Sequence, residues 1–138
     1  MKIYLGGDLR LKAIRNYLEL IDSLVVQKEH SSFLPHRDVP IPHRNGREKG
    51  LLRKKEYQEF GKFVFNKDLQ ALQECDAAIF VLEGLCWGTT LELGYAYAFK
   101  QLINPQLKII GLFTDSKKEE VLDIIKLHAY DIIISTVS

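Results

Sequence analysis

This 138-residue sequence has few cysteines, no long apolar run and almost no excess of charge of either sign. Two cysteines are too few for a disulfide framework and lack metal-ligand spacing. The longest uninterrupted apolar stretch, Ala77 to Leu82, is far below the roughly 18 residues of a membrane span. A net charge of +1 provides no global field for holding a nucleic-acid duplex or an anionic membrane. The sequence begins without the apolar run of a secretory signal, so we expect a cytoplasmic protein.

The length predicts one domain over residues 1–138, because domains usually span about 100–200 residues. Hydrophobic residues make up 46% of the chain. A chain of this size buries roughly two-thirds of the surface that its unfolded form exposes, so its core needs neither disulfides nor a structural metal.

Apolar strand-like segments alternate with segments of helical periodicity along the chain. Strands are expected at 2–5, 76–83, 107–113 and 130–136, with a further one at either 25–26 or 32–34. Helices are expected at 9–21, 53–74, 89–102 and 117–126. Apolar strands that alternate with helices are typical of a parallel sheet covered on both sides. The sequence therefore predicts an α/β fold, with a five-stranded parallel open sheet of flavodoxin-like or Rossmann-like type.

Three segments are expected at the carboxyl edge of this sheet, where open α/β sheets bind ligands. They are residues 6–10, 83–90 and 114–115. The second is a glycine-flanked loop that leads into a helix, a geometry that gathers free backbone N–H groups at a partly positive helix end. We predict Glu92 in the first turn of this helix, where the helix dipole keeps its carboxylate ionised. Such a carboxylate is a candidate nucleophile, or it only complements the dipole.

The segment GLCWGTTLELGYAYA, residues 84–98, resembles the signature helix of the nucleoside 2-deoxyribosyltransferase family. The resemblance continues upstream through FNKDLQALQECDAAIFVLEG, and MKIYLGGDLR and KIIGLFTD look like the family's first strand and its fourth strand, which ends in Asp115. It implies that Glu92 attacks the anomeric carbon of a 2-deoxyribosyl group, that Asp68 is an acid near the base, and that Tyr4 hydrogen-bonds the nucleophile. It also implies nucleoside or nucleotide and free nucleobase as partners, a homo-oligomer, and no cofactor or metal.

Cleavage of an N-glycosidic bond independently favours two carboxyl groups. The reaction builds oxocarbenium character on the sugar, so one carboxylate stabilises or traps it while a second acid helps the base to leave. Without the motif, Asp68 is explained as well by an exposed helix residue that balances Lys67.

Two positions bear on the choice between transfer and hydrolysis. Cys86 stands where the transferases usually carry an aspartate and the related 2'-deoxynucleoside 5'-monophosphate N-hydrolases a serine; packing in the loop is its preferred interpretation. Arg10, beside Gly6 and Gly7, resembles the arginine that the hydrolases place near the phosphate. It binds an oxyanion with its planar fork, or it is a solvated residue at the start of a helix.

The remaining binding candidates are Trp87, Gly88 and Thr89. Trp87 either stacks on a base or caps the core. Residues 36–55 hold seven Lys and Arg against two acids and either close over a nucleotide phosphate or form a solvated loop. They lack interleaved aromatics, so we expect no nucleic acid polymer. The sequence predicts deoxyribosyl transfer between nucleobases; the alternatives are a deoxynucleoside monophosphate hydrolase and a non-catalytic nucleotide-binding domain.

Overall fold

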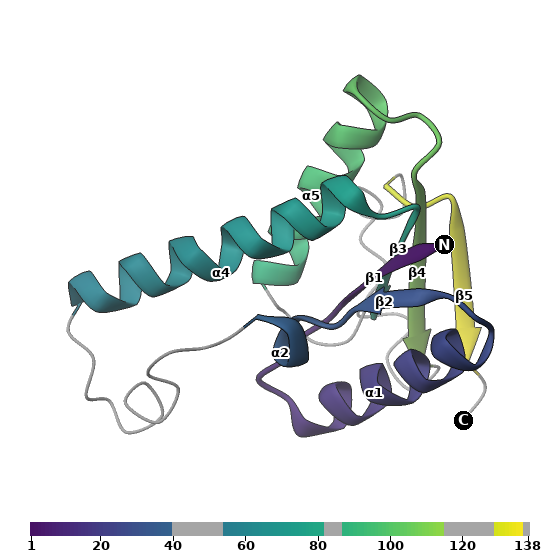
Figure 1. Cartoon of the computed structure of the whole chain (residues 1–138), viewed down its shortest axis with the longest axis horizontal. Coiled ribbons are helices and arrows are strands. Elements are labelled where there is room, and N and C mark those ends of the chain that lie inside the picture. The colour runs from purple at the N-terminus through teal and green to yellow at the C-terminus, as the bar shows by residue number, and fades with distance from the viewer. Residues whose placement is uncertain (40–53, 82–86, 115–128, 137–138) are drawn as a thin grey trace.

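A parallel sheet organises the computed structural model, which describes residues 1–39, 54–81, 87–114 and 129–136 (Figure 1). Its strands are β1 (Lys2–Gly6), β2 (Ser31–Phe33), β3 (Ala77–Val81), β4 (Lys108–Thr114) and β5 (Ile132–Thr136). Their order across the five-stranded sheet is β2-β1-β3-β4-β5, and every neighbouring pair is parallel. This is the flavodoxin-like order of doubly wound folds.

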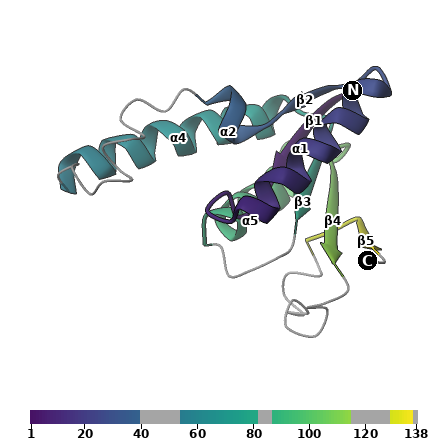
Figure 2. The same cartoon turned by 90° about the horizontal axis from the view of Figure 1, so that it is seen from below.

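Helices cover both faces of the sheet (Figures 1 and 2). The helix α1 (Lys12–Gln27) lies against one face, and α4 (Lys54–Glu74) and α5 (Trp87–Leu102) lie against the other. A short helix, α2 (Pro35–Asp38), follows β2 directly. The predicted α/β class, with a parallel sheet and helices on both faces, is confirmed.

The alternation of side chains along β1 divides the core into two layers. Ile3 and Leu5 point toward α1, where they pack with Ile14 and Leu18. Tyr4 points the other way, into the layer that α4 and α5 cover. Successive residues of a strand face opposite sides of a sheet, so one strand contributes to both layers.

The structure corrects two element boundaries. Of the two predicted positions for a further strand, 32–34 is close to β2, whereas 25–26 belongs to α1. The helix α1 continues to Gln27, beyond its predicted end at residue 21, because Val25 completes its buried face. The predicted helix at 117–126 lies outside the described residues.

The strand order reverses between β1 and β3. The chain passes from β1 to β2 on one side and then returns through α4 to β3 on the other side. Gly6, the last residue of β1, is in register with Phe80 of β3. This is the point at which doubly wound sheets bind their ligands. No helix within the described ranges is long and apolar enough to cross a membrane.

Candidate active site

Three polar side chains from three elements meet in the layer between the sheet and its helices α4 and α5. Tyr4 comes from β1, Asp68 from α4 and Glu92 from α5. Tyr4 has no exposed surface, and Asp68 is only 4% exposed. Both carboxyl groups act electrostatically on the Tyr4 hydroxyl, and they also interact with each other. The structure therefore brings together the three residues that were predicted to be catalytic.

Burial controls the protonation of the two carboxyl groups, which we call the carboxyl pair. The pKa of Glu92 rises from 4.5 to about 8, chiefly through burial and then through the charge of the neighbouring Asp68, whereas a nearby Tyr4 hydroxyl opposes the shift. Burial also raises the pKa of Asp68 to about 6, against the effect of a hydrogen bond with Glu92. Like charges in a dry site disfavour double ionisation. Near neutral pH the carboxyl pair therefore holds one proton.

The prediction that a helix dipole keeps Glu92 ionised is wrong. The helix α5 begins at Trp87, and its first turn contains no acidic residue. Glu92 lies in the second turn, and the effect of the dipole falls off within the first. Burial, and then the charge of Asp68, decide the charge of Glu92 instead, and both favour the protonated form.

Two buried oxygens in this cluster are not satisfied by hydrogen bonds to the described residues. Tyr4 Oη and Asp68 Oδ1 have no partner of normal geometry in the described part of the chain. Burial, and then the charges of Glu92 and Asp68, raise the pKa of Tyr4 well above its ordinary value, so its hydroxyl remains a donor. A buried polar atom without a partner costs about 1–3 kcal/mol, and native proteins rarely leave one without a functional reason.

Gly6 and Gly7, predicted as substrate-binding residues, have a packing role. A Cβ atom at Gly6 would lie 2.8 Å from Phe80 Cδ1, and one at Gly7 would lie 2.9 Å from Ile14 Cγ2. Both glycines are buried. Their neighbours' side chains fill the space of the missing ones, and direct contact with substrate remains a prediction.

Asp8 is a buried residue of the β1–α1 turn that sequence reasoning missed. It is 2% exposed and accepts hydrogen bonds from Arg10 Nε at 2.9 Å and from Arg10 Nη2 at 2.8 Å. The signal was available, because an aspartate in a turn accepts a hydrogen bond from the backbone N–H two residues on, here that of Arg10 at 3.1 Å. The Arg10 side chain is 64% exposed, but any oxyanion must share its guanidinium with a carboxylate.

The other binding candidates from residues 83–90 differ in their exposure to solvent. Trp87 is 86% exposed, so the alternative that it caps the core is wrong. Gly88 is also exposed, whereas Thr89 is buried. Cys86 and Asp115 lie outside the described residues, and their predicted roles remain predictions. No three potential metal ligands cluster within the ranges that the structure describes.

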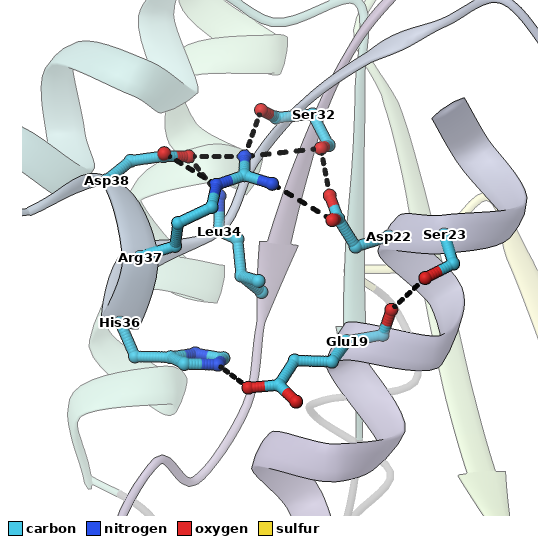
Figure 3. A network of polar contacts seen from close by, with 8 residues as sticks. All are labelled: Glu19, Asp22, Ser23, Ser32, Leu34, His36, Arg37 and Asp38. Atoms are coloured by element: carbon cyan, nitrogen blue, oxygen red, sulfur yellow. Dashed lines mark hydrogen bonds and ion pairs between the residues drawn. The ribbon is translucent and has the colours of Figure 1, made fainter. Parts of the chain in front are cut away.

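The start of the basic segment 36–55 is held by an ion-pair network (Figure 3). Arg37 donates to Asp22 of α1 at 2.9 Å, to Asp38 at 2.7 Å and to the Ser32 carbonyl at 3.0 Å. His36 Nε2 lies 2.9 Å from a Glu19 carboxylate oxygen. Arg37 is therefore neutralised by acids of the protein itself. Residues 40–53 lie outside the described residues.

Comparison with known proteins assigns the family. Residues 3–125 match the model of the family described as Nucleoside 2-deoxyribosyltransferase. A solved 2-deoxyribosyltransferase from Bacillus psychrosaccharolyticus superposes with a TM-score of 0.70 at 16% identity, over 99% of this chain and 87% of that chain. A search of curated proteins finds no match. The chain belongs to the nucleoside 2-deoxyribosyltransferase family, and this membership supports a function of the deoxyribosyltransferase type.

Proposed function

We propose that this protein cleaves the N-glycosidic bond of 2'-deoxyribonucleosides and transfers the deoxyribosyl group to another nucleobase. The observation that carries the proposal is the cluster of the buried Tyr4 and Asp68 with the half-buried Glu92, beside the point where the strand order reverses. Strongly perturbed carboxyl groups at such a point are typical of catalytic sites. Family membership supports the same reaction class.

Glu92 is the nucleophile of the proposed reaction, and Asp68 is its acid in the first step and its base in the second. A Glu92 oxygen forms a bond to the anomeric carbon while the bond from that carbon to the base nitrogen breaks. The electron pair of the broken bond goes to the base, which takes a proton from Asp68. A second nucleobase then attacks the anomeric carbon through nitrogen, releases the Glu92 carboxylate and returns its own proton to Asp68.

Near neutral pH the single proton of the carboxyl pair lies on Glu92, which has the higher pKa of the two groups. The proposed reaction needs the other arrangement, with the proton on Asp68 and the negative charge on Glu92, so the proton passes from Glu92 to Asp68 before the attack. Two carboxyl groups in one site then perform an acid's and a nucleophile's task at the same pH. The Tyr4 hydroxyl, which lowers the pKa of Glu92, favours this form by donating toward the carboxylate.

A second candidate is hydrolysis of deoxynucleoside 5'-monophosphates, in which water attacks the sugar in place of the second base. The exposed guanidinium of Arg10 at the carboxyl edge favours it, since a phosphate there would gain a charge-assisted contact. The Asp8 carboxylate, already paired with Arg10, weakens this case. A protein that binds nucleotides without turnover is the third candidate.

One assay separates the three functions. The protein is incubated with deoxynucleosides and with their 5'-monophosphates, with and without a second free base, and the products are separated by chromatography. Base exchange supports the transferase, and release of base from monophosphates alone supports the hydrolase. Binding without either product contradicts both enzymatic proposals.

Loss of a monophosphate preference in Arg10→Ala would assign the phosphate contact to that guanidinium.

We also propose that the protein is a homo-oligomer that associates through the outer face of α5. Trp87, Leu91 and Leu102 are 86%, 59% and 82% exposed, and with the exposed Ala98 they form a stripe along the helix, which we call the outer stripe. Large contiguous apolar patches on soluble proteins usually mark interaction sites. The outer stripe carries no charge that would repel a second copy.

The occupant that fits the outer stripe best is a second copy in antiparallel orientation. The stripe is symmetric about the middle of α5, so Trp87 would face Leu102, and Leu91 would face the small Ala98. Gly94 lies near the symmetry centre, and a Cβ atom there would have no neighbour within 4 Å. A two-fold interface requires such self-complementarity.

A further inference from the structure

Two phenylalanine rings from neighbouring strands hold the Tyr4 ring. Phe33 of β2 stacks on it with ring centroids 5.6 Å apart and an interplanar angle of 13°. Phe80 of β3 lies 5.9 Å away and is tilted by 48°. Tyr4 and Phe80 have no exposed surface. The position of the Tyr4 ring is therefore set by the strands on both sides of β1.

The space for this arrangement exists because residue 6 has no side chain. Gly6 is in register with Phe80, and a Cβ atom on Gly6 would lie 2.8 and 2.9 Å from two carbons of the Phe80 ring. The same Cβ would lie 3.1 Å from Tyr4 Cε1. Gly6 is part of a regular strand, so its backbone conformation does not require glycine. Glycine is required instead because the rings of Phe80 and Tyr4 occupy the space of a side chain.

A methyl group at residue 6 would displace one or both rings, since a close-packed core has no room to absorb it. The Tyr4 hydroxyl would then move relative to the carboxyl pair. Hydrogen-bond strength depends steeply on distance and angle, and a misplacement of about 1 Å in an active site can cost about a hundredfold in rate.

We infer that Gly6 is a positioning residue for Tyr4: its missing side chain lets the Phe80 ring pack over the end of β1 and fix the Tyr4 hydroxyl against Glu92 and Asp68. This inference rests on the proposed function and gives Gly6 a task other than touching the substrate. The role belongs to Gly6 alone of the two adjacent glycines, because the neighbours of Gly7 belong to the opposite layer of the core.

The first test is a titration that needs no catalytic activity. The Glu92 carboxyl carbon is followed by ¹³C NMR over pH, with Glu92→Gln to assign the signal. In Gly6→Ala the pKa of Glu92 should rise above the wild-type value, because the Tyr4 hydroxyl that lowers it has moved. Gly7→Ala is the matched control for this titration. Its Cβ atom would meet Ile14 Cγ2 at 2.9 Å and Leu18 Cδ1 at 3.3 Å, a similar overlap without contact to Tyr4.

The second test is kinetic and uses a double-mutant cycle. Gly6→Ala should lower kcat for base exchange by about ten- to hundredfold with little change in KM, and it should shift the pH–rate profile. Adding Gly6→Ala to Phe80→Leu should cost less than adding it to the wild type, because the smaller leucine leaves room for the methyl group.

The results separate the inference from the proposed function. A wild type without turnover contradicts the proposed function, and the titration then decides the role of Gly6 by itself. An unchanged Glu92 titration in folded Gly6→Ala, or an equal shift in Gly7→Ala, overturns the inference. If Gly6→Ala does not fold, Phe33→Leu loosens the other side of the Tyr4 ring without adding atoms. It should also raise the pKa of Glu92, and an unchanged value would overturn the inference.

Discussion

At the scale of single residues, the carboxyl pair links the chemistry of the site to the stability of the fold. Asp68 and Glu92 are more basic in the native protein than in an unfolded chain, where such groups titrate near pH 4. As the pH rises above about 4, the unfolded chain therefore loses protons before the native protein does. The cost of burying the carboxyl pair therefore lowers the free energy of unfolding at pH values above about 4.

The free energy of unfolding should accordingly fall as the pH rises from about 4 to about 8, because the native state holds more protons than the unfolded state over this range. Below about pH 4 both states are protonated, and the pair contributes no slope. Each pKa unit corresponds to about 1.4 kcal/mol, so the fall should amount to several kcal/mol. Urea denaturation at several pH values measures it. Glu92→Gln should flatten the slope, and an equal slope in that variant would count against the raised pKa.

The membership of the site was predictable from the sequence, but its protonation was not. The place of Glu92 in its glycine-flanked helix pointed to that residue, and the resemblance to the deoxyribosyltransferase family pointed to Asp68 and Tyr4. The pKa shifts depend on how deeply α4 and α5 bury these groups, which is a property of the packed layer. The Asp8 partner of Arg10 was readable from sequence proximity alone.

At the scale of elements, Arg37 connects α2 to α1 through Asp22 and to β2 through the Ser32 carbonyl (Figure 3). Arg37 holds the pKa of Asp38 below its ordinary value, together with a hydrogen bond from the Leu34 backbone N–H at 2.8 Å. A lowered carboxyl pKa contributes stability above about pH 4 and loses it as the pH falls through the native value.

Replacing Arg37 with glutamine should lower the free energy of unfolding by about 1 kcal/mol at neutral pH, since the side chain is 45% exposed and water screens its ion pairs. The difference should shrink in acid as Asp38 becomes protonated. Denaturation of Arg37→Gln at pH 7 and pH 3 measures both effects. Lys62→Gln, at an exposed position of α4, is the control for loss of one positive charge. Equal destabilisation by both variants would contradict a specific role for the network.

Long periodic elements were easier to predict than short ones. The helix α4 was expected at 53–74 and is found at Lys54–Glu74, because its apolar positions recur at helical spacing over many turns. The three-residue strand β2 has too few positions to show a period. Its place is fixed by pairing with β1, a contact between distant parts of the chain.

At the scale of the whole molecule, the alternation of apolar strands and helices predicted a parallel sheet but not the order of its strands. The flavodoxin-like order depends on which edge of the sheet each crossover reaches. The rule that ligands bind where the order reverses nevertheless pointed to residues 6–10 and 83–90, which follow the neighbouring strands β1 and β3.

The proposed association through the outer stripe predicts that Leu91→Glu shifts the protein toward the monomer. A buried, unpaired carboxylate would oppose contact between two copies. Light scattering coupled to size-exclusion chromatography measures the molar mass over a range of concentrations. Leu24→Glu on α1 is the matched control, because Leu24 is 54% exposed against 59% for Leu91. A monomeric wild type, or an equal effect of both variants, would contradict the proposal.

The most direct test of the central claim compares the initial rate of base exchange between deoxynucleosides and free bases for the wild type and Glu92→Gln. Glutamine keeps the size of the side chain and its place in α5, but its amide cannot attack the anomeric carbon as a carboxylate does. The rate should fall by more than about a thousandfold, while circular dichroism shows an unchanged fold. A folded Glu92→Gln variant that exchanges bases within about tenfold of the wild-type rate would contradict the assignment of Glu92 as the nucleophile.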